Sequence, residues 1–166
     1  MVSSTEWRAF MCHNLGATIT LNPYTPAPGL VGTRYNAYRN WYVNGKKNTA
    51  LDPCPENYRI PTVNEWQGVI DNNVISTAPD SKAGDGNGGY FLGPNLMLPY
   101  AYRGTNAISY WAGNQKLPSY PNAFTLVSSG ISNTLFLGYN TYPYTNDVYT
   151  TTPSPIRCIA IPDNEK

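Results

Sequence analysis

Apolar residues recur at helical spacing in one stretch of the chain, which predicts a helix from Val63 to about Asp71. Thr62 and Glu65 have the spacing of a capping box, in which each side chain satisfies a backbone donor at the helix start. Trp66 and the apolar residues three and four positions after it form one stripe on the helix. Two asparagines follow Asp71 and are expected to end the helix.

Elsewhere, β-branched and aromatic residues gather in short runs between turn residues, which is the pattern of short strands. The predicted strands are Trp7–Met11, Asn57–Ile60, Leu96–Leu98, Ala123–Val127, Thr134–Leu137 and Ile156–Ile161. The fourth and fifth flank a turn of two serines and a glycine, so they are expected to pair as a hairpin. Asn22–Gly32 and Pro79–Gly89, rich in Pro or Gly, are expected to be loops. The fold class is therefore α+β, with short antiparallel strands, one clear helix and long loops.

The composition changes sharply in the last third of the chain. Of the 51 residues of Thr105–Pro155, 26 are Asn, Ser, Thr or Tyr and only Lys116 and Asp147 are charged, whereas the preceding 104 residues hold 15 charges. Tyr offers a large, rigid contact area with a polar tip, and Ser, Thr and Asn offer adaptable hydrogen bonds. This mixture is typical of a binding face, so 105–155 is the candidate ligand-binding region.

Within this region the candidate contact residues fall in two predicted loops. They are Asn114, Gln115, Ser119, Tyr120 and Asn122 in the first loop, and Tyr139, Asn140, Tyr142, Tyr144, Asn146, Asp147 and Tyr149 in the second. Tyrosines clustered on loops can form binding hot spots, because each ring buries much area while losing only two rotors. The alternative is that these are ordinary loop residues, with some of the rings packed inward. Trp7, Trp66 and Trp111 are expected in the core.

Size and charge exclude several other classes. A chain of 166 residues is expected to form a single domain. The net charge is +1 and the one basic doublet is Lys46-Lys47, so a nucleic-acid partner is not expected. No apolar run is long enough to insert directly into a membrane. Glu6, Arg8 and His13 interrupt the start of the chain, so no signal peptide is expected in it.

The sequence favours neither a metal site nor an enzyme. Asp80, Asp85 and Asn87 could supply oxygen ligands to calcium, but they do not form an EF-hand pattern, and a Gly-rich turn is the preferred interpretation. The single histidine, His13, has no nucleophile motif to act with. No cofactor is expected. Oligomeric state is not indicated by any pattern.

Three cysteines, at positions 12, 54 and 158, allow three single disulfides and always leave one thiol over. The chain has no Cys-x-x-Cys pair, and Cys12-His13 alone is too poor a ligand set for a structural zinc site. The cysteines are therefore either small buried side chains or include one disulfide pair.

Several separated blocks of the chain resemble one family. They are Phe10–Ala17, Asp52–Trp66, Leu96–Gly104, Tyr110-Trp111 and Ser154–Ile159. The second block, with Asp-Pro-Cys-Pro followed by Arg-Ile-Pro-Thr and then Glu-Trp, is the most specific. In this order the blocks resemble the Fibrobacter-type major paralogous domain, which is common in secreted Bacteroidetes proteins. Two positions depart from the family pattern, since glycine is usual at 57 and at 102, where this chain has Asn and Tyr.

The resemblance implies a C-type lectin-like fold, in the branch that includes formylglycine-generating enzymes. In that fold a disulfide often joins the start of the first helix to the last strand, which favours Cys54 paired with Cys158. Cys12 would then be free and buried in the first strand. The enzymes of the branch use paired reactive cysteines, and no second cysteine lies near Cys158 in the sequence, so the chain is expected not to be an enzyme. A degenerate enzyme of this group is kept as an alternative.

The same fold is used by the variable proteins of diversity-generating retroelements, many of which resemble this domain. Their variable codons lie near the C-terminus and yield mainly Asn, Tyr, Ser, Thr and similar residues, as found in 105–155. The resemblance implies an adhesion domain at the cell surface or outside the cell, or on a virion tail if phage-encoded. Its partner would be a protein or glycan on a host or target cell. The alternative is a fixed-specificity adhesin or carbohydrate-binding module.

Overall fold

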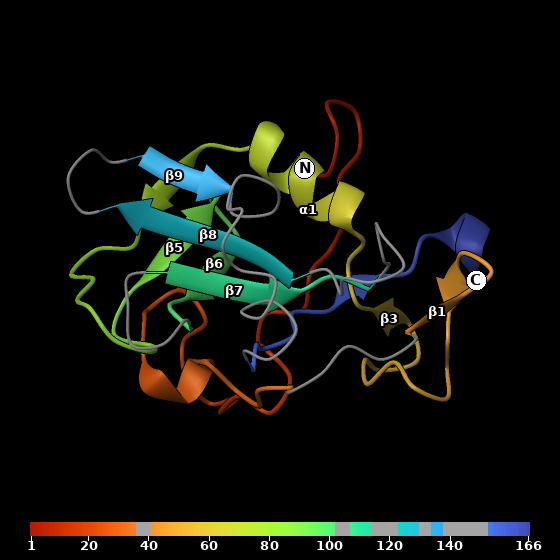
Figure 1. Ribbon diagram of the computed structural model, residues 1–166, viewed down its shortest axis with the longest axis horizontal. Helices are drawn as coiled ribbons and strands as arrows, with labels where there is room; N and C mark the ends of the chain where they lie inside the picture. The colour runs from red at the N-terminus through yellow and green to blue at the C-terminus, as the bar shows by residue number, and fades with distance from the viewer. Residues whose placement is uncertain (36–40, 102–106, 114–122, 130–133, 138–152) are drawn as a thin grey trace, which may run out of the picture.

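The computed structural model describes residues 1–35, 41–101, 107–113, 123–129, 134–137 and 153–166, and in 123–129, in 134–137, at Val63 and at Ala107 it describes the backbone alone. Within these residues it contains one α-helix, two short 3-10 helices and ten short strands (Figure 1). In chain order they are η1 (Pro28–Leu30), β1 (Tyr42–Val43), β2 (Lys46–Lys47), β3 (Tyr58–Arg59), α1 (Val63–Asp71), β4 (Ile75–Thr77), β5 (Gly89–Leu92), β6 (Met97–Pro99), β7 (Ala107–Trp111), β8 (Ala123–Ser129), β9 (Thr134–Leu137), β10 (Ile159–Ala160) and η2 (Asp163–Glu165).

The predicted helix is confirmed as α1, Val63–Asp71. The side chain of Thr62 accepts a hydrogen bond from the backbone N–H of Glu65, and the Glu65 carboxylate accepts one from the backbone N–H of Thr62. This is the capping box expected from the sequence. The helix ends at Asn72, whose backbone N–H and side-chain amide both donate to the carbonyl oxygen of Gly68.

The strands form four small antiparallel sheets, β1–β2, β10–β3, β4–β5–β6 and β7–β8–β9. The predicted hairpin is confirmed, because β8 pairs with β9 through Leu126 opposite Leu137 and Ser129 opposite Thr134. Strand β8 also takes in two serines that were expected to form the turn. The predicted strands near residues 57, 96 and 156 are present in shorter or shifted form as β3, β6 and β10. The class is α+β with short antiparallel strands, as predicted.

The main core lies between α1, the β5–β6 hairpin and β7. Trp66 and Val69 of α1 are 0% and 1% exposed and pack with Tyr90 and Leu98 of the hairpin and with Tyr110 of β7. Figure 1 shows this arrangement, with β5 and β6 beside the β7–β9 sheet and α1 along one side of both. The apolar stripe of α1 therefore packs on one side of this main core.

A second core surrounds the place where β3 and the C-terminal segment meet. Trp41, Ile60, Trp111 and Ile156 are buried there around the sulfur atoms of Cys54 and Cys158. Trp41 meets Trp111 edge to face with ring centroids 5.4 Å apart. The prediction that Trp66 and Trp111 are core residues is confirmed.

The N-terminal segment differs from its prediction. In place of a strand over Trp7–Met11, only Phe10 forms an isolated bridge, to Ile159 of β10. The predicted burial of Trp7 is wrong, since its side chain is 66% exposed. The reason is that Phe10 occupies the place on the core, with its ring centroid 5.3 Å from that of Trp66. Trp7 lies before the point where the segment joins β10, and its ring is left at the surface.

Glycine at position 68 lets the N-terminal segment cross α1 closely. A Cβ at Gly68 would collide with the backbone carbonyl of Val2, which is itself buried. In the described part of the chain, no helix has the length and apolar character needed to cross a membrane.

Candidate functional site

The twelve residues predicted to contact a ligand lie outside the described residues, in the stretches 114–122 and 138–152. The structure does describe the residues that flank these stretches, namely Gly113, Ala123, Leu137 and Pro153. These four flanking residues therefore mark where the two stretches leave and rejoin the framework.

Two of the flanking residues lie at one end of the β7–β8–β9 sheet. Trp111, the last residue of β7, pairs with Ala123 at the start of β8, so the first stretch leaves and rejoins the sheet at this end. Strand β9 runs antiparallel to β8, and its last residue, Leu137, pairs with Leu126 in the middle of β8. The second stretch therefore leaves the sheet from the end of β9, opposite the middle of β8.

The fourth flanking residue, Pro153, is held beside β7 by the residues that follow it. Ser154 bridges to Tyr35, and its Oγ lies 2.8 Å from the Oγ of Ser109 in β7. The carbonyl oxygen of Pro155 accepts a hydrogen bond of 3.3 Å from the backbone N–H of Trp111. All four flanking residues therefore lie on or beside this sheet, two of them at its Trp111 end.

Buried contacts fix this end of the sheet. Trp111 is fully buried, and its indole N–H donates to the carbonyl oxygen of Tyr35 at 2.9 Å. The backbone N–H of Gly113 donates to the carbonyl oxygen of Pro61 at 2.8 Å. A Cβ at Gly113 would collide with the ring of Tyr42, so the chain can leave β7 by this route only with glycine at that position.

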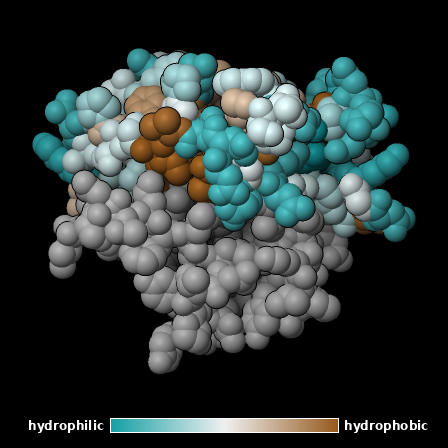
Figure 2. Space-filling view, turned by 90° about the horizontal axis from the view of Figure 1, so that it is seen from above, coloured by the Kyte–Doolittle hydropathy of each residue, from teal (hydrophilic) through white to brown (hydrophobic). Residues whose placement is uncertain are grey.

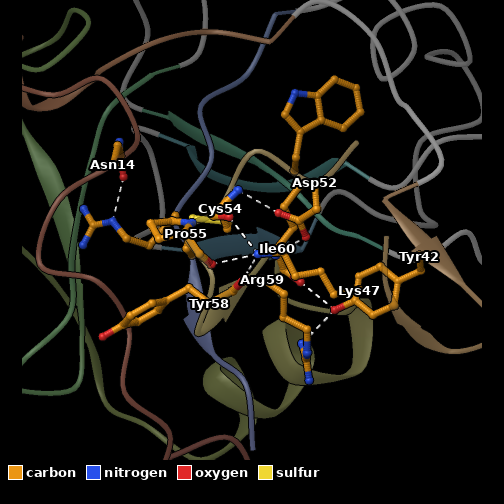
Figure 3. The surroundings of a disulfide bond; sticks show 12 residues. Asn14, Tyr42, Lys47, Asp52, Cys54, Pro55, Tyr58, Arg59 and Ile60 are labelled. Carbon is orange, nitrogen blue, oxygen red and sulfur yellow. Dashed lines mark hydrogen bonds between the residues drawn. A yellow bond between two sulfur atoms is a disulfide. The ribbon is translucent and has the colours of Figure 1, made fainter. Parts of the chain in front are cut away.

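Cys54 and Cys158 form a disulfide with their Cα atoms 5.9 Å apart, the pairing that the family resemblance implies. The Asp52 carboxylate holds the loop around Cys54, since its two oxygens accept the backbone N–H groups of Cys54 at 2.8 Å and Ile60 at 3.1 Å (Figure 3). Burial raises the pKa of Asp52, although these two hydrogen bonds act in the opposite direction. The disulfide indicates an oxidising, extracellular setting.

Lys47 binds the other side of the same loop. Its ammonium group donates to the carbonyl oxygens of Cys54 and Pro55, each at 2.7 Å, and of Tyr58 at 2.5 Å (Figure 3). An ammonium group has three N–H donors, so this lysine has one carbonyl acceptor for each donor. Lys47 is therefore a structural residue of this loop.

Arg59 joins α1, β3 and the C-terminal segment. Its guanidinium makes two hydrogen bonds with Glu65, at 2.7 and 2.8 Å, and one of 3.0 Å with Glu165. It also donates to the hydroxyl of Tyr42 at 2.8 Å (Figure 3). Burial alone would lower the pKa of Arg59, but the hydrogen bonds and charge of Glu65 outweigh burial, so the pKa is raised. Glu65 thus both caps the helix and pairs with the arginine.

Arg157 joins the N-terminal segment to β6 from the C-terminal side. It is 3% exposed and donates to Asn14 Oδ1 at 2.7 Å and to the carbonyl oxygens of Met11, Cys12 and Met97 at 3.0 to 3.1 Å. No carboxylate of the described residues lies within ion-pair distance of it. Burial lowers the pKa of Arg157, partly offset by its neighbours. Its role is to order the chain around the first block of the family pattern.

Cys12 is free, but its predicted burial is wrong because the side chain is exposed. Arg157 binds the backbone carbonyls of Met11 and Cys12, and this holds the chain in a bend that places the thiol at the surface. The neighbouring His13 places Nε2 2.9 Å from the carbonyl oxygen of Leu21. A nucleophile paired with His13 is not found among these contacts.

The Gly-rich turn expected at Pro79–Gly89 is a loop up to Gly88, and β5 begins at Gly89. Asp85 pairs there with Arg34, with 2.6 Å between its Oδ2 and the arginine Nη2. Among the described residues, no group of three His, Cys, Asp or Glu side chains has the arrangement of a metal site.

One surface feature has no counterpart in the sequence predictions. A cleft of about 370 Å³ opens between the N-terminal segment, the end of α1 and the turn between β5 and β6. Its exposed lining residues include Trp7, Tyr24 and Asn95, and its buried lining residues include Val69 and Leu96. We call it the Trp7 cleft. The exposure of Trp7 could not be predicted from the sequence, because the short aromatic and apolar run Trp7–Met11 has the composition of a buried strand.

The chain matches no protein-family model, no curated protein and no solved structure. Its function is therefore inferred from its own residues.

Proposed function

We propose that this protein is a non-enzymatic ligand-recognition domain with a C-type lectin-like fold, and that residues 105–155 form its binding face. The observation that carries this proposal is that both candidate stretches leave and rejoin the framework at the β7–β8–β9 sheet. Two long stretches anchored on the same packed sheet can present their side chains to one ligand.

The composition of the two stretches supports the same function. They hold the tyrosines, asparagines, serines and threonines that binding loops use, with very few charges. A ligand bound by such residues would be held by ring contacts and neutral hydrogen bonds. The partner we propose is a protein or glycan on a host or target cell, bound at the cell surface or by a virion tail.

We further propose that the binding face is diversified by a retroelement. Mutation of adenines in the codons of 105–155 would produce the residue types that are enriched there. The contacts that hold the framework come from residues outside the two stretches. In this arrangement the loops can change while Trp111, Gly113 and Pro155 keep the sheet end in place. A binding face of fixed specificity would use the same framework, and only the gene sequence distinguishes the two.

An enzyme of the formylglycine-generating type is not favoured. Cys158 is joined to Cys54, which leaves Cys12 as the single free thiol of the chain. Chemistry that needs two free cysteines close together would require this disulfide to be reduced first.

Replacing Tyr142, Tyr144 and Tyr149 by Ala tests the binding face. The fluorescently labelled protein would be applied to a panel of bacterial and epithelial cells, each time in a Trp7→Ala background, and the triple variant should lose the binding to cells that the Trp7→Ala protein shows. The midpoint of thermal unfolding should change by only a few degrees, because exposed substitutions typically cost about 0.5 kcal/mol or less. Val43→Ala, at an exposed site on β1, is the matched control and should bind normally.

Unchanged binding by the triple variant, or a large loss of stability, would contradict the proposed face. Diversification is tested separately at the gene. A template repeat next to a reverse transcriptase gene should differ from the codons for 105–155 at adenines alone. A locus without both elements would leave a recognition domain of fixed specificity.

A further inference from the structure

The exposure of Trp7 sets it apart from the other tryptophans of the chain. Trp41, Trp66 and Trp111 are at most 1% exposed, whereas Trp7 is 66% exposed. Among the residues drawn in colour, the side of the molecule seen in Figure 2 is mostly polar, with the strongest hydrophobic colour near the middle of the view. A single exposed apolar side chain is common on protein surfaces, but an exposed tryptophan ring that lines a cleft offers a large contact area with a polar tip.

Trp7 lines the Trp7 cleft together with apolar side chains that are already buried in the core. Val69, Leu92 and Leu96 are 1%, 3% and 7% exposed and form part of its wall. The volume of about 370 Å³ lies within the range of roughly 300 to 1,000 Å³ that ligand pockets occupy. The cleft thus combines a rigid apolar wall with an aromatic ring that can lie against a flat ligand.

The exposed lining residues also carry neutral polar groups that are not used within the protein. The indole N–H of Trp7, the hydroxyl of Tyr24 and the side-chain amide of Asn95 make no hydrogen bond with any described residue. The indole group donates only, while the hydroxyl and the amide can both donate and accept. A ligand that enters this cleft therefore meets donors and acceptors together.

The two charged groups of the lining are both engaged within the protein. Arg8 Nε lies 2.5 Å from an oxygen of Glu6, and the N-terminal ammonium of Met1 donates to Asn73 Oδ1 at 3.0 Å. An anionic ligand would have to compete with this carboxylate for the arginine. The cleft therefore suits an uncharged ligand better than an acidic one.

We propose that the Trp7 cleft binds a neutral pyranose oligosaccharide. A pyranose ring has an apolar face of C–H groups, which would lie on the indole ring of Trp7. The hydroxyl groups around its edge both donate and accept hydrogen bonds, which matches Tyr24 and Asn95. None of the cleft residues belongs to 105–155, so this proposal does not depend on the proposed binding face.

A proline-rich peptide is the main competing ligand, since it also binds to exposed aromatic rings. Its backbone offers carbonyl acceptors and, at proline, no N–H donors. The acceptor oxygen of the Asn95 amide would then face no donor. An oligosaccharide can satisfy both kinds of group, which is why it is the ligand proposed.

Intrinsic tryptophan fluorescence tests the proposal directly, because Trp7 is the exposed emitter among four tryptophans. The probes are the trisaccharides of glucose, mannose, xylose and N-acetylglucosamine, with trigalacturonic acid and a polyproline peptide for comparison. At least one neutral trisaccharide should shift the emission to shorter wavelength in a saturable way. No shift with any neutral sugar, or a shift with polyproline alone, would overturn the proposal.

Substitutions locate the binding. Calorimetry should show that Trp7→Ala weakens the affinity for the active trisaccharide by at least about tenfold, the effect of a hot-spot residue. Tyr24→Phe keeps the Trp7 emission and should weaken binding by a smaller factor. Val43→Ala is exposed but does not line the cleft, and should bind like the parent. Equal affinity of the Trp7→Ala and parent proteins would place the sugar elsewhere and refute the site.

Cys12 gives an independent readout, because this exposed free thiol also lines the cleft. Bound trisaccharide should slow the reaction of Cys12 with N-ethylmaleimide, and the alkylated protein should bind the sugar less well. The slowing should disappear in Trp7→Ala. Alkylation at an unchanged rate in saturating sugar would contradict binding in this cleft.

Discussion

Two arginines are almost inaccessible to solvent in this protein, but their hydrogen-bond partners differ in charge. Arg59 is 2% exposed and is paired with the carboxylates of Glu65 and Glu165. Arg157 is 3% exposed and is surrounded by four neutral oxygens, three of them backbone carbonyls. The pKa of the first is raised, because its carboxylate partners outweigh its burial, and that of the second is lowered by burial.

The difference teaches what each arginine stabilises. Arg59 holds side chains, and both of its carboxylate partners keep some contact with water. Arg157 binds backbone carbonyl oxygens in two segments, around Met11 and at Met97. Neither segment forms a regular strand pair with the segment that contains Arg157. Removing Arg59 should therefore leave groups that water can solvate, whereas removing Arg157 should leave buried acceptors without donors.

Arg157→Ala should have the largest effect. Three backbone carbonyls and the side-chain oxygen of Asn14 lose their donors at once, so the free energy of unfolding should fall by about 4 kcal/mol. Arg157→Lys should cost less, but it should not restore stability, because an ammonium group cannot span the acceptors that the planar guanidinium reaches. Urea unfolding of the three proteins measures both changes. A loss for Arg157→Ala smaller than that for Arg59→Ala would break the comparison.

Arg59→Ala should cost about 2 kcal/mol, between the values for an exposed and a fully buried ion pair. Because Glu165 is 34% exposed, part of the Arg59 interaction should be screened by salt. The cost of Arg59→Ala should therefore shrink in concentrated sodium chloride, while that of Arg157→Ala stays constant. The same urea titrations at low and high salt check this. Equal salt dependence of the two costs would show that the carboxylates contribute little.

The smallest effect concerns Tyr110, which lies beside Arg157 and accepts a hydrogen bond of 2.9 Å from Asn14. Burial raises the pKa of Tyr110 from 10.0 to about 12, partly offset by Arg157. The unfolded chain therefore loses this proton first, so stability is fully present below pH 10.0 and falls as the pH rises toward about 12.

Tyr110→Phe should make this alkaline loss of stability less steep. At neutral pH the substitution should cost about 1 kcal/mol, because Asn14 loses an acceptor. Thermal unfolding on either side of pH 10.0 measures both effects. Some slope should remain, since burial also raises the pKa of Tyr42 and Tyr100. A slope unchanged from the parent would mean that Tyr110 is solvated in the folded protein.

The local features of the fold could be predicted from the sequence. The helix over Val63–Asp71 follows from its capping box and apolar stripe, and the β8–β9 hairpin from two apolar runs around a serine turn. Both depend on residues that are neighbours in the chain. The pairing of Cys54 with Cys158 came from the family resemblance and not from spacing.

The errors concern residues whose surroundings are set by distant parts of the chain. Trp7 is exposed because Phe10 takes the position on Trp66, and Cys12 is exposed because Arg157 orders the backbone beside it. The three carbonyl contacts of Lys47 could not be predicted either, because a pair of lysines in a sequence is typical of the solvent-exposed surface. For the candidate binding face, the residues were predicted from composition, while the anchoring of both stretches on the β7–β8–β9 sheet depends on strand pairing between distant segments.

The disulfide has a consequence for proteolysis. Cys54 and Cys158 are 104 positions apart, so their bond closes a covalent ring that contains α1, both three-stranded sheets and the whole of 105–155. A protease that cuts one peptide bond in this ring opens it without releasing a fragment. The nicked protein would migrate as one species until a reducing agent is added, and its two pieces would stay tethered at the second core.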